Sequence, residues 1–85
     1  MDRYEVELKP QAQKDMRRLS KRDNSRVFDA LEKIRENLAG DVKRLTNFTP
    51  EYRLRVGNYR VLFEIEDGNR VVIYRVRHRR DAYRD

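Results

Sequence analysis

The sequence predicts an α+β domain built from an N-terminal strand, an antiparallel helical hairpin and three further antiparallel strands. Three patterns indicate this class: apolar residues alternate with acidic ones over residues 4–8, recur at helical spacing over 10–38, and alternate with arginines over 52–77. The 85 residues suffice for one domain, 1–85, with a thin core. The strands are therefore expected to form one sheet, with both helices packed on one of its faces.

The first strand and the first helix are each marked by a regularly spaced apolar set. The strand has the set Tyr4, Val6 and Leu8. Pro10 follows, and proline suits the first turn of a helix because its fixed φ is helical and its missing N–H is not needed there. The predicted helix then carries the set Ala12, Met16 and Leu19.

A second helix is predicted to begin near Asp23, Asn24 or Ser25, whose short polar side chains are good N-caps. Its apolar positions are Val27, Ala30, Leu31, Ile34 and Leu38. Gly40 is predicted to stop the helix, because glycine readily adopts the left-handed conformation that follows many helices. Each helix is amphipathic, so the pair is expected to form an antiparallel hairpin that covers the sheet.

The remaining residues predict a loop followed by three strands. Residues 41–51 have no clean period and are assigned to the loop. Gly57-Asn58 is predicted to form a two-residue hairpin turn, which places Arg55 directly opposite Arg60. Guanidinium groups side by side on a sheet repel one another, so this arrangement costs stability unless an anion relieves it.

The turn between the last two strands, near residues 67–69, decides which side chains are buried. An odd number of turn residues would bring Arg75 and Arg77 into the core at high cost, so an even number is predicted. The core face then holds Tyr52, Leu54, Val56, Tyr59, Val61, Phe63, Ile65, Val72, Tyr74 and Val76. The opposite face holds Arg53, Arg55, Arg60, Arg75 and Arg77, above an apolar floor of Leu62, Val71 and Ile73.

The composition favours a polyanionic partner. Lysine and arginine number 21 against 15 acidic residues, a net charge of +6, which suits nucleic acid, an anionic membrane or an acidic protein. The absence of cysteine excludes disulfides, thiolate catalysis and cysteine-based zinc sites. No apolar run approaches the ~20 residues of a membrane span, and the N-terminus lacks the apolar stretch of a signal peptide. A cytoplasmic protein is expected.

His78 and Tyr83 are candidates for chemistry at the edge of the arginine face. The neighbouring charges of Arg77 and Arg79 favour the neutral imidazole that a general base needs, although a lone histidine is more commonly structural. Tyr83 either packs near the C-terminus or stacks on an unpaired base. A metal site is not expected, for want of clustered ligands. A merely solvated surface is the other interpretation of the arginines.

Two segments, YRLRVGNYRVLF at 52–63 and RHRRDAY at 77–83, carry a resemblance to a known family. Following a strand and a helical hairpin, they resemble the RelE/ParE toxin superfamily, and the RelE branch fits best. The resemblance covers essentially the whole chain and implies the RelE-like microbial RNase fold. It also implies a type II toxin–antitoxin toxin that acts as a ribosome-dependent mRNA endonuclease. Such toxins cut mRNA in the ribosomal A site, by 2′-hydroxyl attack on the adjacent phosphate, and inhibit translation.

The resemblance implies a set of site residues as well. Carried over by position, the catalytic set is Arg53, Arg55, Arg60, Arg79 and Tyr83, with His78 where some relatives use a histidine acid or base. Further RNA-binding charge would come from Arg75, Arg77 and Arg80. Some relatives have lysines at the positions of Arg53 and Arg55, whereas arginine stays protonated and is a poor base. Proton removal would then fall to His78, Tyr83 or ribosomal groups.

The partners that the resemblance implies are a RelB-like antitoxin encoded by the adjacent gene, the ribosome and mRNA, with no cofactor, metal or membrane. Two other functions remain open. One is a ParE-like toxin that inhibits DNA gyrase by binding, which does not need clustered arginines with a terminal tyrosine. The other is a non-catalytic RNA-binding module of the same fold.

Overall fold

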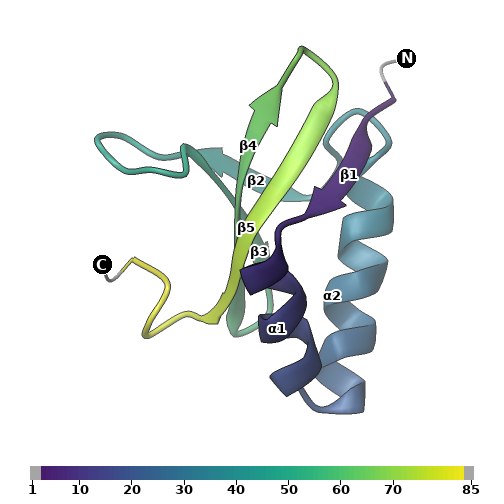
Figure 1. The fold of residues 1–85 in the computed structure, drawn as a ribbon, viewed down its shortest axis with the longest axis vertical. Helices are drawn as coiled ribbons and strands as arrows, with labels where there is room; N and C mark the ends of the chain where they lie inside the picture. The colour runs from purple at the N-terminus through teal and green to yellow at the C-terminus, as the bar shows by residue number, and fades with distance from the viewer. Residues whose placement is uncertain (1–2, 84–85) are drawn as a thin grey trace.

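The computed structural model describes residues 3–83, so the two ends of the predicted domain, 1–2 and 84–85, lie outside the described residues. The elements in chain order are β1 (Glu5–Leu8), α1 (Pro10–Arg18), α2 (Lys21–Ile34), β2 (Asp41–Arg44), β3 (Tyr52–Val56), β4 (Tyr59–Glu66) and β5 (Arg70–His78). Figure 1 shows the strands as one twisted sheet with both helices on one side. The α+β class and the helices-on-one-face arrangement are confirmed.

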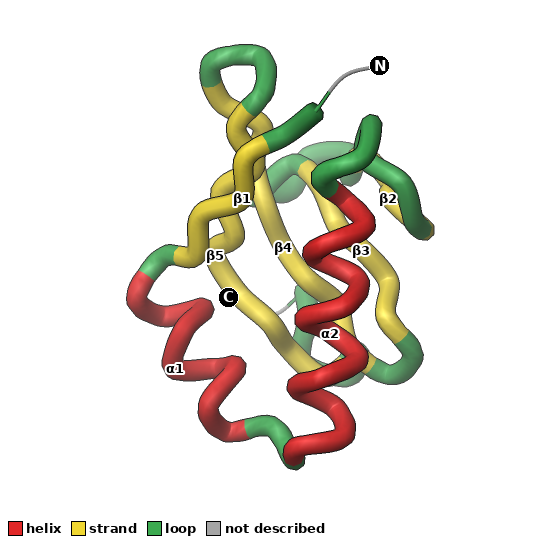
Figure 2. Tube along the Cα trace, turned by 90° about the vertical axis from the view of Figure 1, so that its right-hand side faces the viewer, coloured by secondary structure: helices red, strands yellow, loops and turns green. Residues whose placement is uncertain are grey.

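The sheet of the described residues has five strands in the order β1-β5-β4-β3-β2. β1 lies parallel to β5, and the other neighbours are antiparallel. The tube in Figure 2, turned toward the helices, shows α1 beside β5 and α2 across β3 and β4. The core between these two layers consists of Ala12, Met16, Val27, Leu31, Ile34, Leu54, Val61, Phe63, Val71, Ile73 and Val76.

The boundaries of the second helix differ from the prediction. α2 begins at Lys21, because the hydroxyl of Ser20 accepts a hydrogen bond from the backbone N–H of Asp23 at 3.1 Å and so caps the helix earlier than expected. It ends at Ile34, and Leu38 lies beyond it with a φ of 57°, although its side chain still packs against the core. Gly40 therefore does not stop the helix but enters the next strand.

Residues 41–44 form an edge strand, β2, where a loop was predicted. The segment pairs with β3 so that Asp41 lies opposite Arg55 and Lys43 opposite Arg53. Its charged side chains give no apolar alternation, because at the edge of a sheet only Val42 packs partly against the core. Long-range pairing rather than local pattern defines this strand.

The turn between β4 and β5 has an odd number of residues, so the predicted even length is wrong. Glu66 pairs with Arg70, which leaves residues 67–69 in the turn and places Val71 and Ile73 in the core rather than beneath the arginines. A register shift opposite Leu62 and Phe63 then leaves one residue of β5 without a partner.

The unpaired residue at this β-bulge is Tyr74, and it returns the following residues of β5 to the faces that were predicted for them. Arg75 pairs with Leu62 and Arg77 with Arg60, so both arginines stay outside the core. Tyr74 does not join the core, contrary to the prediction, and its hydroxyl donates to Glu66 at 3.2 Å. Val72, predicted for the core face, is buried beside Leu62 on the other face. The bulge thus keeps Arg75 and Arg77 out of the core, as an even turn would have done.

Candidate nucleic-acid interface

A row of three arginines crosses the sheet on the face opposite the helices. Cross-strand pairing places Arg55 of β3 beside Arg60 of β4, and Arg60 beside Arg77 of β5. Asp41 of β2 stands at the end of this arginine row, opposite Arg55. The row places three cations on adjacent strands, so it concentrates positive charge on this face of the sheet.

The side chains of the arginine row are held by backbone oxygens. Arg60 Nη1 donates to the carbonyl oxygens of Gly57 at 3.0 Å and of Tyr59 at 2.9 Å, and Arg77 Nη1 donates to the carbonyl oxygen of Asp81 at 3.1 Å. Arg55 is exposed, and no described residue accepts a hydrogen bond from its guanidinium. The neutral carbonyl partners of Arg60 orient its guanidinium while leaving its charge available to an anion.

A second row, one step along the same face, is more strongly tied to the protein. Arg53 lies between Lys43 and Leu62, and its Nη1 donates to the carbonyl oxygen of Asp41 at 2.7 Å and to a carboxylate oxygen of Asp41 at 3.1 Å. The Arg53 side chain is only 14% exposed. Arg53 is therefore bound to Asp41 and presents little charge to solvent.

Arg75 forms a bidentate ion pair with Asp15 of α1. Its Nε lies 2.8 Å from one carboxylate oxygen and its Nη2 lies 3.1 Å from the other, while the backbone N–H of Val76 donates to the same carboxylate at 2.9 Å. Asp15 is 6% exposed. Burial raises the pKa of Asp15, but hydrogen bonds from Arg75 and Val76 outweigh it and hold the pKa below its usual value.

Sequence reasoning missed Asp15, although the spacing contained the signal. Asp15 shares a helical face with Ala12, Met16 and Leu19, all of which pack toward the sheet. An acid on an apolar face needs a buried partner, and α1 lies against β5, where Arg75 supplies one. The arginine predicted to bind RNA at this position thus joins the helix to the sheet.

His78 lies on the helix side of the sheet, not at the edge of the arginine face as predicted. It pairs across the ladder with Tyr59, and the two rings meet edge to face with centroids 5.6 Å apart. Both line a cavity of about 230 Å³ together with Asp23 and Arg26 of α2. The error has a simple cause, because His78 is one residue beyond Arg77 and successive strand residues face opposite ways.

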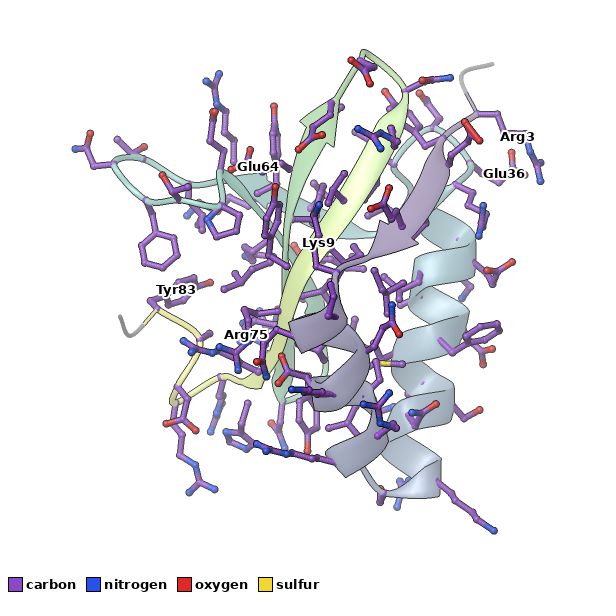
Figure 3. All side chains as sticks on the ribbon, in the orientation of Figure 1. Arg3, Lys9, Glu36, Glu64, Arg75 and Tyr83 are labelled. Atoms are coloured by element: carbon purple, nitrogen blue, oxygen red, sulfur yellow. The ribbon has the colours of Figure 1, made fainter. Side chains whose placement is uncertain are left out.

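The C-terminal segment, residues 79–83, turns back toward the β3–β4 hairpin. The backbone N–H of Arg79 donates to the carbonyl oxygen of Asn58 at 2.7 Å, that of Asp81 donates to His78 at 2.8 Å, and Ala82 is fully buried. These contacts fix the segment, while the Arg79 and Arg80 side chains are exposed. Figure 3 shows Tyr83 on the side of the sheet that faces away from the helices.

Tyr83 contacts an aromatic residue that the sequence did not single out. Its ring meets Phe48, in the loop between β2 and β3, edge to face at 5.5 Å and 87°. Tyr83 remains 46% exposed. The loop and the C-terminal segment project on the same side of the sheet in Figure 1, so the aromatic pair lies on the face that carries the arginines.

Residues 3–83 contain no group of three or more acidic or histidine side chains arranged to hold a metal ion. Among the same residues, neither helix is long and apolar enough to cross a membrane. The guanidinium and aromatic groups of this surface can supply binding and charge stabilisation.

The match to a protein family extends over nearly the whole described chain. Residues 6–83 match the family described as the ParE toxin of the type II toxin-antitoxin system, parDE. The chain belongs to the RelE/ParE superfamily of toxins. The superfamily expected from residues 52–63 and 77–83 is thus confirmed.

Relatives of this RelE/ParE toxin include proteins named RelE. Toxin RelE3 of Methanocaldococcus jannaschii is 40% identical over 43 residues, which are 51% of this chain and 48% of RelE3, so the match spans about half the length of that relative. The toxin–antitoxin complex RelBE2 from Mycobacterium tuberculosis contains a chain with a TM-score of 0.77 and 30% identity, over 91% of this chain and 99% of the other.

A RelB-RelE antitoxin-toxin complex from Methanococcus jannaschii matches this toxin with a TM-score of 0.75 and 27% identity, over 92% and 95% of the two chains. The family match thus names ParE, whereas these structures name RelE. The two branches share the fold, and the arrangement of the site has to separate them.

Proposed function

We propose that this type II toxin is a ribosome-dependent mRNA endonuclease. The observation that carries the proposal is the arginine row, Arg55, Arg60 and Arg77, on the same face as the exposed ring of Tyr83. Charges on adjacent strands can contact successive phosphates, and a tyrosine ring offers a stacking surface for an unpaired base. RNA in an extended, single-stranded form, as at a ribosomal A site, presents both features.

The reaction that fits this surface is transesterification. The 2′-oxygen bonds to the adjacent phosphorus, the bond from phosphorus to the 5′-oxygen breaks, and the proton lost at the 2′-oxygen is balanced by one gained at the 5′-oxygen. Negative charge builds on the phosphorane, and fixed guanidinium groups stabilise it by roughly 3 kcal/mol each. A stacked base would hold the nucleotide in the orientation for attack.

The roles of the predicted residues follow from their positions. Arg55, Arg60 and Arg77 face the RNA, Arg53 is bound to Asp41 in the second row, and Arg79 and Arg80 are exposed beside Tyr83. Arg75 serves the ion pair with Asp15. Because His78 faces the helices, proton removal is left to Tyr83 or to groups of the ribosome.

The test is cleavage of a programmed mRNA by the purified toxin with and without ribosomes. We expect cuts within the A-site codon only when ribosomes are present, with a 5′-hydroxyl on the downstream fragment. Equal cleavage of free mRNA would contradict the ribosome dependence, and no cleavage in either case would contradict the nuclease.

The second candidate is a toxin that inhibits DNA gyrase by binding alone. The family match to ParE favours it, and so does the position of the lone histidine on the helix side of the sheet, because binding needs no proton acceptor. A supercoiling assay separates the two candidates. Inhibition of gyrase by the purified chain, in a preparation that leaves ribosome-bound mRNA intact, would favour this second function.

An antitoxin is the partner that we propose for the free toxin. The matched structures include complexes of RelB with RelE, and the arginine row here is an exposed cationic surface that an acidic segment would neutralise. Co-expression with the product of the adjacent gene is expected to yield a stable complex. Recovery of the two proteins as separate species would argue against this partner.

A further inference from the structure

The contact between Phe48 and Tyr83 joins two segments that are far apart in the chain. Phe48 belongs to the loop between β2 and β3, and Tyr83 follows the end of β5. The loop projects from the sheet (Figure 1), and its Thr49 and Pro50 line a hollow of about 600 Å³ together with Tyr74 and Arg75 of β5. The contact bridges the face that carries the arginines, and we call the Phe48–Tyr83 pair the aromatic arch.

The geometry of this pair leaves part of the tyrosine available. The rings are nearly perpendicular at 87°, with centroids 5.5 Å apart, so no planar group fits between them. Such an edge-to-face contact occupies one side of the pair and leaves Tyr83 46% exposed. A base can therefore stack on Tyr83 only from outside the pair.

One end of the arch is anchored by a backbone hydrogen bond and the other by a buried residue. The base of the loop is closed by the N–H of Leu45, which donates to the carbonyl oxygen of Glu51 at 2.6 Å, and Ala82 beside Tyr83 is fully buried. The loop that carries Phe48 is thus closed by a contact that does not involve Tyr83, and Phe48 can restrict the ring of a tyrosine whose own side chain is half exposed.

We infer that Phe48 is a positioning residue, which fixes the ring of Tyr83 in the orientation that stacks on an unpaired RNA base. The inference rests on the proposed RNA-directed function and adds a residue to its site. Loss of an edge-to-face contact changes the population of the oriented ring by about fivefold, so the affinity for a stacked base should fall by a similar factor.

The experiment uses the full chain and a short single-stranded RNA that carries 2-aminopurine, whose fluorescence is quenched when it stacks. Titration at low salt gives an affinity that does not depend on cleavage. We expect Phe48→Ala and Phe48→Leu to weaken the quenching about fivefold. Phe48→Tyr keeps the aromatic ring and should therefore show quenching as strong as that of the wild type. Phe28→Ala, which removes an exposed aromatic ring from α2, is the matched control and should behave as the wild type.

A double variant distinguishes positioning from direct contact. Tyr83→Ala should lower the affinity to a weaker but still measurable value, and adding Phe48→Ala should then lower it no further. An additional loss in the double variant would mean that Phe48 contacts the RNA itself. Wild-type quenching by Phe48→Leu would mean that Phe48 does not position Tyr83. Either result overturns the inference.

The same measurements separate this inference from the proposed nuclease. Quenching that depends on Phe48, in a protein that leaves ribosome-bound mRNA uncut, would refute the nuclease and retain the positioning role. Cleavage without any quenching by the wild type would refute the positioning role and retain the nuclease.

Discussion

At the scale of single residues, the arginines of the sheet divide into those that bind the protein and those that face solvent. Arg75 is bound to the buried carboxylate of Asp15, and Arg53 is bound to Asp41. Arg55 is exposed, and Arg60 donates to carbonyl oxygens, which do not neutralise its charge, so both charges are available to a ligand. The chemical properties of arginine are the same at each position, and only the partner differs.

Replacement of Arg55 by alanine is expected to slow A-site cleavage by about 100-fold, the usual cost of removing one fixed donor from a developing anion. Arg55→Lys should recover part of the rate, because it keeps the charge without the planar fork. The measurement is single-turnover cleavage on programmed ribosomes. Arg17→Ala, at an exposed position of α1, is the control. A rate for Arg55→Ala equal to that of the control would remove Arg55 from the site.

At the scale of elements, the ion pair between α1 and β5 connects the helical layer to the sheet. β1 pairs with β5 only as far as Ile73, so the rest of that edge of β5 faces α1 instead of a strand. Asp15 accepts the N–H of Val76 along this edge and also holds Arg75 next to the bulge. One carboxylate thus accepts a hydrogen bond from the unpaired edge of β5 and also binds the arginine that follows the bulge.

Arg75→Ala is expected to lower the free energy of unfolding by about 3 kcal/mol, because it leaves the Asp15 carboxylate buried without its cation. Urea denaturation measures the loss. Arg3→Ala breaks the exposed pair with Glu36 and should cost far less. Equal losses in the two variants would show that burial does not matter to the Arg75 pair.

The lowered pKa of Asp15 predicts a dependence of stability on pH. Because the folded pKa lies below the unfolded one, the ionised carboxylate stabilises the fold at neutral pH, and this contribution is lost as the pH falls below about 4. Asp15→Asn removes it. The stability difference between wild type and variant, measured in urea from pH 7 to pH 3, should therefore shrink toward acid. A constant difference would contradict this linkage.

The backbone conformation just before β2 depends on Gly40. Its φ is +129°, and a Cβ there would approach Leu54 Cδ1 to 2.9 Å, so Gly40→Ala should lose about 2 kcal/mol of unfolding free energy. Gly68 has a φ of +83° and open space around it, which leaves only the backbone strain of about 1 kcal/mol. Thermal denaturation of the two variants compares them. A larger loss at Gly68 would be inconsistent with the close packing of Gly40.

At the scale of the whole molecule, the two faces of the sheet have different roles. The helices cover one face of the sheet, while the arginine row and the aromatic arch lie on the other, with a net charge of +6 for the chain. Binding to RNA should therefore weaken as salt rises, because each phosphate contact releases a counterion.

Arg55→Ala should reduce the slope of log K against log salt by about 0.7, which corresponds to one phosphate contact on a single strand. Fluorescence titration with the same RNA at several salt concentrations measures the slope. Arg17→Ala again serves as the control. An unchanged slope for Arg55→Ala would place its side chain away from the phosphates.

Local patterns determined much of this protein. Alternation of side chains identified β1, β3, β4 and β5, helical spacing identified both helices, and the Gly57-Asn58 turn fixed Arg55 beside Arg60. These features depend on residues close in sequence, and the periodicity of an element records which of its side chains share a face. The opposition of Arg55 and Arg60, which began as a prediction from one turn, is therefore also the part of the site that the fold reproduces.

The tertiary structure alone decided the remaining features. The pairing of β2, the bulge at Tyr74, the ion pair of Asp15 with Arg75 and the contact of Phe48 with Tyr83 each join segments distant in the chain. No local period encodes such contacts, because they depend on which elements pack together. His78 shows the consequence: a shift of one position along a strand moves a side chain to the opposite face, and only the register of β5 against β4 reveals which face it occupies.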